Sequence, residues 1–220
     1  MEWHEVARLR QGLYRFFGAA LLPPDLERLR LLQAAAGTLD DMGVDAFAFA
    51  RSWRRFTDAL TTVEDPIALG SDYIRLFEAG VGDVPVPLFE SAYRADARSG
   101  GTGALLASIR RRYADLGLEP DTGVTGGIDH LSIELETMAA LCAREAEAWE
   151  TGAEARVATL LAQERSFLAD HPGAWIPKVT DRLHAMKADR FYRALGDALH
   201  AFTHHDREFL AVLEAGVGTA

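Results

Sequence analysis

The sequence predicts an all-α protein, a single helical-bundle domain of about ten helices that spans residues 1–220. Apolar residues recur at spacings of three and four along nearly the whole chain, which is the period of a helix with one buried face. No run of β-branched residues alternates with the helical segments, so a parallel sheet is not expected. Hydrophobic residues make up 49% of the chain, which is ample for the core of one domain.

Four helices are expected in the first part of the chain. Pro23-Pro24 stops the first and Gly37 ends the second, because proline lacks an N–H and glycine favours helix ends. Pro66 opens the fourth at its first turn. The apolar positions are Val6, Leu9, Leu13, Phe16, Phe17 and Ala20; then Leu26, Leu29, Leu32 and Ala36; then Phe47, Phe49, Trp53, Phe56 and Leu60; then Leu69, Tyr73, Leu76 and Phe77.

The second part of the chain contains further helices separated by glycine-rich or proline-containing segments. SGGTG at 99–103 and DTGVTGG at 121–127 are expected to be flexible loops, and HPGAWIP at 171–177 is expected to break a helix. The two glycine-rich loops could act as hinges, which would allow a domain-swapped homodimer. The apolar positions are Leu105, Leu106, Ile109 and Tyr113; then Leu131, Leu135, Met138 and Cys142; then Leu160, Leu161, Phe167 and Leu168; then Val179, Leu183 and Met186; then Phe191, Leu195, Leu199, Phe202, Phe209 and Leu213.

Composition excludes several classes of function. The net charge is −10, from 33 acidic and 23 basic residues, so a nucleic-acid-binding face is not expected, whereas a basic partner would be attracted. The single cysteine, Cys142, cannot form an internal disulfide or a paired-cysteine metal site. The chain starts without a signal-peptide pattern, and its apolar stretch at 16–24 is too short to span a bilayer. We therefore expect a cytoplasmic protein without stable membrane insertion.

The segment 129–142 opens on Asp129-His130. Asp129 is placed to cap the following helix, with His130 in the first turn and Glu134 one turn further on. One interpretation is a plain cap beside a surface histidine. The other is that Asp129 and His130 are exposed hydrogen-bonding groups at the mouth of a pocket.

The segment 84–93 is expected to be an extended loop followed by a short helix. Pro85 and Pro87 each lack an N–H, which excludes a central strand. Such a stiff loop loses little entropy on binding and could present Phe89 to a ligand. The alternative is that Leu88 and Phe89 pack in the core. Ser91 could cap the short helix.

A metal-dependent helical hydrolase is the alternative from another functional class. His200 and His204 lie one helical turn apart, with Asp206 close behind, and His130 with Glu134 forms a second candidate set. A zinc-binding HExxH motif, a GxSxG nucleophile elbow and a P-loop are all missing from the sequence.

Taken together, the segments resemble the TorD/DmsD/NarJ family of cytoplasmic maturation chaperones for molybdenum-containing redox enzymes. Residues 73–77 (YIRLF), followed by Pro87 to Tyr93, are similar to a Y-x-x-L-F, spacer, P-x-x-x-S-x-Y pattern. Residues 129–135 match D-H-x-x-x-E-L, and residues 167–175 resemble an F-x-x-x-H-x-x-x-W segment. These motifs occur in the family order across nearly the whole chain.

This resemblance implies a TorD-like, all-α protein that is not an enzyme and carries no catalytic residue, metal or cofactor. Its expected partners are the twin-arginine signal peptide and the catalytic subunit of a molybdopterin-containing oxidoreductase, which it would hold back from export until cofactors are inserted. Action on the mature part of the client is a further alternative. The peptide-contacting residues carried over are Asp129, His130, Pro87, Phe89, Glu90, Ser91, Tyr93, Glu134, Tyr14, Tyr73 and Phe77.

Three carboxylates of this set, Asp129, Glu90 and Glu134, are expected to pair with the arginines of the peptide. His130 is expected to titrate near physiological pH and so to make binding pH-dependent. The sequence departs from the family at Gly127, where many relatives have proline. We expect this glycine to loosen the loop that presents Asp129.

Overall fold

The computed structural model describes residues 1–78, 84–96, 100–123 and 125–217. Within these ranges the chain forms ten α-helices and no β-strand, so the predicted all-α fold is confirmed. The helices are α1 (Trp3–Ala20), α2 (Leu26–Asp41), α3 (Ala50–Thr61), α4 (Pro66–Tyr73), α5 (Ser91–Arg94), α6 (Gly101–Asp115), α7 (Leu131–Glu150), α8 (Glu154–Asp170), α9 (Pro172–Ala185) and α10 (Arg190–Val217). A 3₁₀ turn, η1 (Val44–Ala46), precedes α3, and a π-helical turn, η2 (Ile74–Glu78), continues α4.

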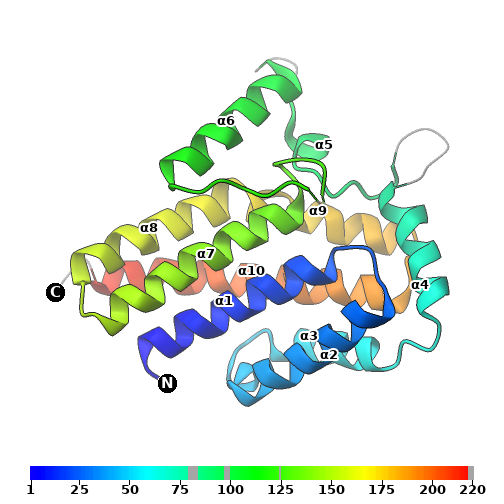
Figure 1. Ribbon diagram of the computed structural model, residues 1–220, viewed down its shortest axis with the longest axis horizontal. Helices are drawn as coiled ribbons and strands as arrows, with labels where there is room; N and C mark the ends of the chain where they lie inside the picture. The colour runs from blue at the N-terminus through cyan, green and yellow to red at the C-terminus, as the bar shows by residue number, and fades with distance from the viewer. Residues whose placement is uncertain (79–83, 97–99, 124, 218–220) are drawn as a thin grey trace.

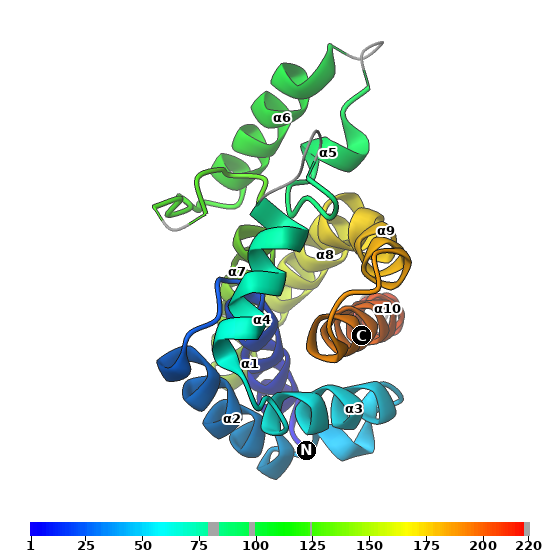
Figure 2. The same ribbon diagram turned by 90° about the vertical axis from the view of Figure 1, so that its right-hand side faces the viewer.

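The long helices α1, α7, α8 and α10 form the body of the bundle and run roughly along its long axis (Figure 1). α1 packs most extensively against α7, and α10 packs against α3, α8 and α9. Viewed from one end, α2 and α3 lie on one side of the bundle and α6 lies on the opposite side, beside α5 (Figure 2). Two of the segments identified in the sequence, at the starts of α5 and α7, therefore lie on the α6 side.

Aromatic side chains from α1, α3 and α10 fill the centre of the bundle. The rings of Phe17 and Phe202 stack with their centroids 5.6 Å apart, and Trp53 lies 4.9 Å from Phe16. Trp53 is fully buried, and its indole N–H donates to Asp40 at 2.6 Å. Rings of this size dominate the apolar area removed from water and so hold the three helices together.

Helix starts follow the local chemistry of the sequence. The Asp25 side chain accepts the backbone N–H of Arg28 at the start of α2. The Asp65 carboxylate accepts the N–H groups of Ile67 and Ala68 in α4, with Pro66 at the first helical position as expected. Both caps satisfy N–H groups that have no partner inside the helix.

At three places where the sequence predicts a break between helices, the helices extend further than expected. α2 continues through Gly37 to Asp41, since a glycine at an exposed helix position costs only about 1 kcal/mol. α6 already begins at Gly101, so most of the expected 99–103 loop is helical; residue 99 and the glycines at 80 and 82 lie outside the described residues. α9 begins at Pro172 and accommodates Pro177, which confines the break to His171.

None of the described helices is long and apolar enough to cross a membrane.

Candidate functional site

The segment that precedes α5 and the segment that precedes α7 lie antiparallel to each other. The Leu131 N–H donates to the Leu88 carbonyl at 2.8 Å, and the Glu90 N–H donates to the Asp129 carbonyl at 2.9 Å. These bonds close an isolated antiparallel bridge. The two segments singled out in the sequence are therefore parts of one structural unit.

Phe89 and His130 are the two residues paired by this bridge. Their rings meet edge to face, with centroids 5.1 Å apart and planes at 80°. A Cβ added to Gly127 would lie 2.9 Å from Cε1 of Phe89, closer than side-chain carbons approach. Gly127 thus allows the Phe89 ring to lie against the loop backbone, a packing role that differs from the loosening expected from the sequence.

His130, rather than Asp129, caps α7. Its Nδ1 accepts the backbone N–H of Ser132 at 3.2 Å, and the helix begins at Leu131. The His130 side chain is buried, and this burial lowers its pKa to about 4, against the smaller opposing effect of the Asp129 charge. The prediction that His130 titrates near physiological pH is therefore wrong, because it assumed an exposed ring.

Asp129 is also buried, with only 4% of its surface exposed. Its Oδ2 accepts the backbone N–H of Ser91 at 3.1 Å, so the carboxylate serves the start of α5. The Ser91 side chain does not cap this helix. Asp129 is consequently a link between the two segments, which differs from both interpretations of the sequence, a cap of the following helix and an exposed group at a pocket mouth.

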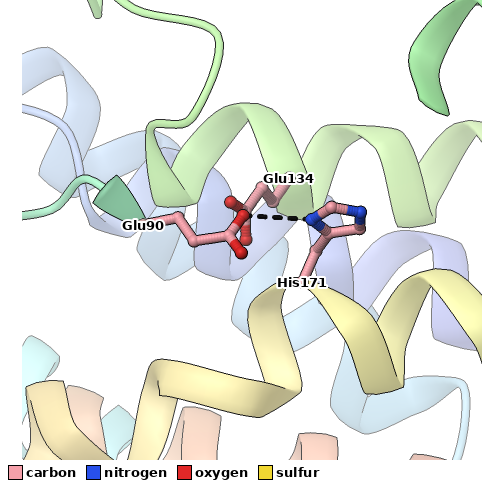
Figure 3. A group of neighbouring side chains, drawn as sticks. All are labelled: Glu90, Glu134 and His171. Atoms are coloured by element: carbon pink, nitrogen blue, oxygen red, sulfur yellow. Dashed lines mark hydrogen bonds and ion pairs between the residues drawn. The ribbon is translucent and has the colours of Figure 1, made fainter. Parts of the chain in front are cut away.

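Behind this unit, Glu90, Glu134 and His171 point toward one another from three parts of the chain (Figure 3). Glu90 precedes α5, Glu134 lies in the first turn of α7, and His171 joins α8 to α9. Oε2 of Glu90 lies 3.0 Å from Nδ1 of His171. All three residues are buried, and both glutamates are completely enclosed.

Each glutamate also has a partner on its outer side. Arg94 donates to Oε1 of Glu90, and the indole N–H of Trp175 donates to Oε2 of Glu134 at 3.0 Å. Burial, reinforced by the charge of Glu90, raises the pKa of Glu134 well above its ordinary value. Burial alone would raise the pKa of Glu90 as well, but its contacts with His171, Glu134 and Arg94 outweigh this and lower it.

The expectation that three carboxylates of this site pair with peptide arginines fails for a common reason. Asp129, Glu90 and Glu134 are all enclosed, and Glu90 is already paired with Arg94 of the same chain. A carboxylate that is buried and already hydrogen-bonded cannot reach a partner's guanidinium without unfolding the site. These residues shape the site and do not form its surface.

The residues of the site that do reach the surface are Pro87, Phe89, Ser91 and Tyr93, all of which are partly exposed. The Tyr93 ring stacks on Trp175 at 5.2 Å, and the guanidinium carbon of Arg182 lies 4.9 Å from its centroid. Burial raises the pKa of Tyr93 to about 12. This side of the site presents apolar and aromatic groups on a rigid support.

Three further residues carried over from the resemblance lie in the core. Tyr14 is fully buried and donates to Asp206 at 2.6 Å. Tyr73 and Phe77 pack on each other with centroids 4.9 Å apart, and Phe77 meets Tyr192 of α10 at 5.3 Å. These aromatic residues therefore stabilise the bundle and do not line a peptide groove.

Sequence reasoning missed a buried charge cluster centred on Arg10 of α1. The guanidinium contacts Glu145 of α7, Glu164 of α8 and Asp206 of α10, each at 2.5 Å. Arg10 lies beside Leu9 on the apolar stripe of its helix, and Asp206 follows Phe202 by one turn. Charged residues on apolar stripes are the signal that could have revealed this cluster.

The histidines proposed for a hydrolase do not assemble a metal site with the aspartate. Asp206 faces Arg10 inside the bundle, whereas the His204 side chain is exposed and lies 3.7 Å from Glu208. His130 uses Nδ1 to cap α7 and is not grouped with Glu134. Neither of the two sets suggested by the sequence is among the potential metal-binding groups of the described residues.

A separate apolar hollow of about 690 Å³ lies between α1 and α2. Its lining includes Phe16, Ala19, Leu31, Leu32, Ala35, Leu39 and Met42. Leu31 is 64% exposed there, so the hollow is a second apolar surface on the side of the bundle away from α6.

The sequence of this chain is similar to those of several known proteins. Residues 45–181 match the family model described as the nitrate reductase delta subunit. The chain is 32% identical over 169 residues to a selenate reductase assembly chaperone protein from Thauera selenatis, covering 75% of this chain and 83% of that one. It is 31% identical over 180 residues to a chlorate reductase assembly chaperone protein from Ideonella dechloratans, covering 79% and 88%.

A third relative is a chaperone protein TorD from Aeromonas salmonicida (strain A449), 31% identical over 151 residues, covering 69% of this chain and 64% of that one. Among solved structures, a putative redox enzyme maturation protein from Archaeoglobus fulgidus matches with a TM-score of 0.52. That match has 17% identity and covers 91% of this chain and 93% of the other. At this identity the structural likeness concerns the fold.

Proposed function

Because the chain belongs to the nitrate reductase delta subunit family, and its relatives are reductase assembly chaperones, we propose that it is the dedicated assembly chaperone of a redox enzyme and not itself an enzyme. Its client is the catalytic subunit of a molybdopterin-containing oxidoreductase. The chaperone acts in the cytoplasm and binds the twin-arginine signal peptide at the N-terminus of that subunit. Binding keeps the subunit from export until its cofactors are inserted.

One observation carries this proposal: the bridge between Phe89 and His130 unites the two signature segments in one rigid unit. The unit presents Phe89 and Tyr93 at the surface; the His130 ring lies against Phe89, and Asp129 accepts the backbone N–H of Ser91 between them. A preorganised aromatic surface binds a flexible peptide at a smaller entropic cost than a loose loop would. Pro87 and Ser91 extend the same surface.

The two features of a twin-arginine peptide would be recognised by different means. The apolar stretch, bound as a helix or in an extended form, would contact the aromatic side chains. The arginines would be attracted by the net charge of −10, since the carboxylates of the site itself are enclosed. We therefore expect the apolar stretch to dominate affinity and the arginines to affect mainly the association rate.

Titration of the purified protein with fluorescent twin-arginine leader peptides from several molybdoenzymes tests this proposal. We expect binding to one leader or a few leaders, and a change of Phe89→Ala should weaken it by about tenfold or more, as for a buried aromatic contact. The matched control is Leu31→Ala, which removes an exposed apolar side chain from the hollow between α1 and α2. Affinity should be unchanged in this control.

Three results would contradict parts of the proposal. Absence of binding to every leader would remove the signal-peptide role. Loss of binding in Leu31→Ala but not in Phe89→Ala would move the site to the α1–α2 hollow. Equal complex formation with a client that lacks its leader would show that the mature part of the client is the main contact.

A further inference from the structure

Glu90, Glu134 and His171 form the densest group of metal-ligating side chains near the proposed client-binding surface (Figure 3). One potential ligand atom from each residue lies within 4.8 Å of the other two. The group mixes two carboxylate oxygens with one imidazole nitrogen and draws them from three different parts of the bundle. The predicted peptide-contacting set contains the two glutamates but not His171, which lies far from both along the chain.

The outer atoms of both glutamates are held in place by further donors. Arg94 bonds Oε1 of Glu90, and Trp175 bonds Oε2 of Glu134. The inner oxygen of Glu90 faces Nδ1 of His171 at 3.0 Å. Metal sites commonly have this arrangement: one atom of a side chain is the ligand, and the other accepts or donates a hydrogen bond that fixes the orientation of the side chain.

By hydrogen-bond geometry, Oε1 of Glu134 has no donor among the described residues, although the side chain is completely buried. A bond between the carboxyl groups of Glu134 and Glu90 would need a proton shared by the two. A buried carboxylate oxygen without a partner is costly, so something must compensate for it. Glu90 and Asp129 add negative charge nearby, and Arg94 is the positive side chain paired with Glu90. A cation between the two carboxylates and the imidazole would satisfy the unpaired oxygen and balance the excess charge.

We propose that Glu90, Glu134 and His171 bind a single divalent transition-metal ion through Glu90 Oε2, Glu134 Oε1 and His171 Nδ1. A mixed nitrogen and oxygen ligand set suits ions such as Zn²⁺, whereas Mg²⁺ and Ca²⁺ prefer oxygen alone. The enclosure of both glutamates keeps a substrate from the site, and a fourth ligand such as a water molecule would complete the tetrahedral set around the ion. The ion ties the start of α5 to α7 and to the α8–α9 junction.

This inference does not depend on the proposed chaperone function, because it concerns only the chain's own residues. The competing arrangement is a single proton held between the two carboxylates without any ion. The variant Glu134→Gln distinguishes a bound ion from a shared proton. Glutamine keeps an oxygen for Trp175, and its amide can donate to Glu90 as a protonated Glu134 would.

The test is equilibrium dialysis of the untagged, chelator-treated full chain against Zn²⁺ in excess Mg²⁺, with bound metal measured by mass spectrometry. We expect one equivalent of zinc in the wild type, and loss of that equivalent in Glu134→Gln and in His171→Gln. His184→Gln, which alters an exposed histidine–aspartate pair, is the matched control and should keep it. Zinc should also raise the melting temperature of the wild type and of the control only.

The proposal is overturned if the wild type binds no zinc, or if both variants retain the bound zinc. Should a variant fail to fold, X-ray absorption of the zinc-loaded wild type decides. One imidazole with carboxylate oxygens supports the site, whereas several imidazoles or a sulfur ligand contradict it. The shared proton is supported instead if two results occur together. The Glu134→Gln variant is then as stable as the wild type, and zinc does not stabilise the wild type.

Discussion

Phe89 lies opposite His130 in an antiparallel bridge, and the edge of one ring meets the face of the other at a centroid distance of 5.1 Å. This contact joins two motifs that are far apart in the sequence. It also explains why His130 is buried while Phe89 stays partly exposed. The His130 ring packs against the Phe89 ring, so a substitution in one segment should alter the position or stability of the other.

Gly127→Ala should disturb this support. The new Cβ would lie 2.9 Å from Cε1 of Phe89, and relief of such a contact costs about 1–3 kcal/mol in well-packed sites. Urea unfolding of Gly127→Ala, Phe89→Leu and the double variant would measure it. In the double variant the cost should shrink, because leucine is the smaller neighbour. Strict additivity would mean that the two residues do not meet.

Asp129→Ala should destabilise the start of α5. The carboxylate accepts the Ser91 N–H from within the protein, and losing such a bond costs about 1–2 kcal/mol. Asp129→Asn keeps an acceptor oxygen and should cost less. Hydrogen exchange of the Ser91 amide is the direct measurement. Unchanged protection in Asp129→Ala would show that the bond is not formed in solution.

His130 should make the protein sensitive to acid. Its pKa is about 4 in the folded chain against 6.5 as the ordinary value, so both states hold a neutral ring above pH 6.5. Between these values the unfolded chain takes up a proton that the folded chain does not, and the free energy of unfolding falls as pH falls, by at most about 3 kcal/mol.

The variant His130→Asn retains a helix-capping side chain but cannot titrate. Unfolding free energies at pH 7 and pH 4.5 should therefore differ less in this variant than in the wild type. An equal acid-induced loss in both proteins would assign the effect to other groups.

Arg10→Met should be among the most destabilising single changes. It leaves the acidic side chains of Glu145, Glu164 and Asp206 buried without the guanidinium, and breaking a buried ion pair in this way costs about 3–5 kcal/mol. Arg8→Met is the control on the same helix, where an exposed pair with Glu150 is worth about 0–1 kcal/mol. Thermal unfolding of the two variants gives the comparison, and similar melting temperatures would contradict it.

Glu164 should weaken the fold as pH rises. Burial raises its pKa to about 8, although the nearby Arg10 opposes this. A raised pKa means that its contribution is fully present below pH 4.5 and is lost as pH rises through about 8. Glu164→Gln cannot ionise, so its stability should change less than that of the wild type between pH 5 and pH 9. Parallel pH profiles would rule out this role.

Local patterns were sufficient to predict the helices and several of their ends. The three- and four-residue spacing, Asp65 with Pro66 at the start of α4, and the stop at Pro23-Pro24 all act within a few residues. The predictions that failed, at Gly37 and around Pro177, each relied on a single residue whose local preference did not end the helix.

The sequence by itself therefore determined the all-α class, the order of the helices and the motifs that mark the family, because these depend on periodicity and on residue order. Only the tertiary structure decided which charged side chains are enclosed. Asp129 meets Ser91, Arg10 meets Asp206, and Glu134 meets His171 only after the helices pack. The physical reason is that burial and charge pairing depend on three-dimensional neighbours, which the spacing of residues along one helix does not specify.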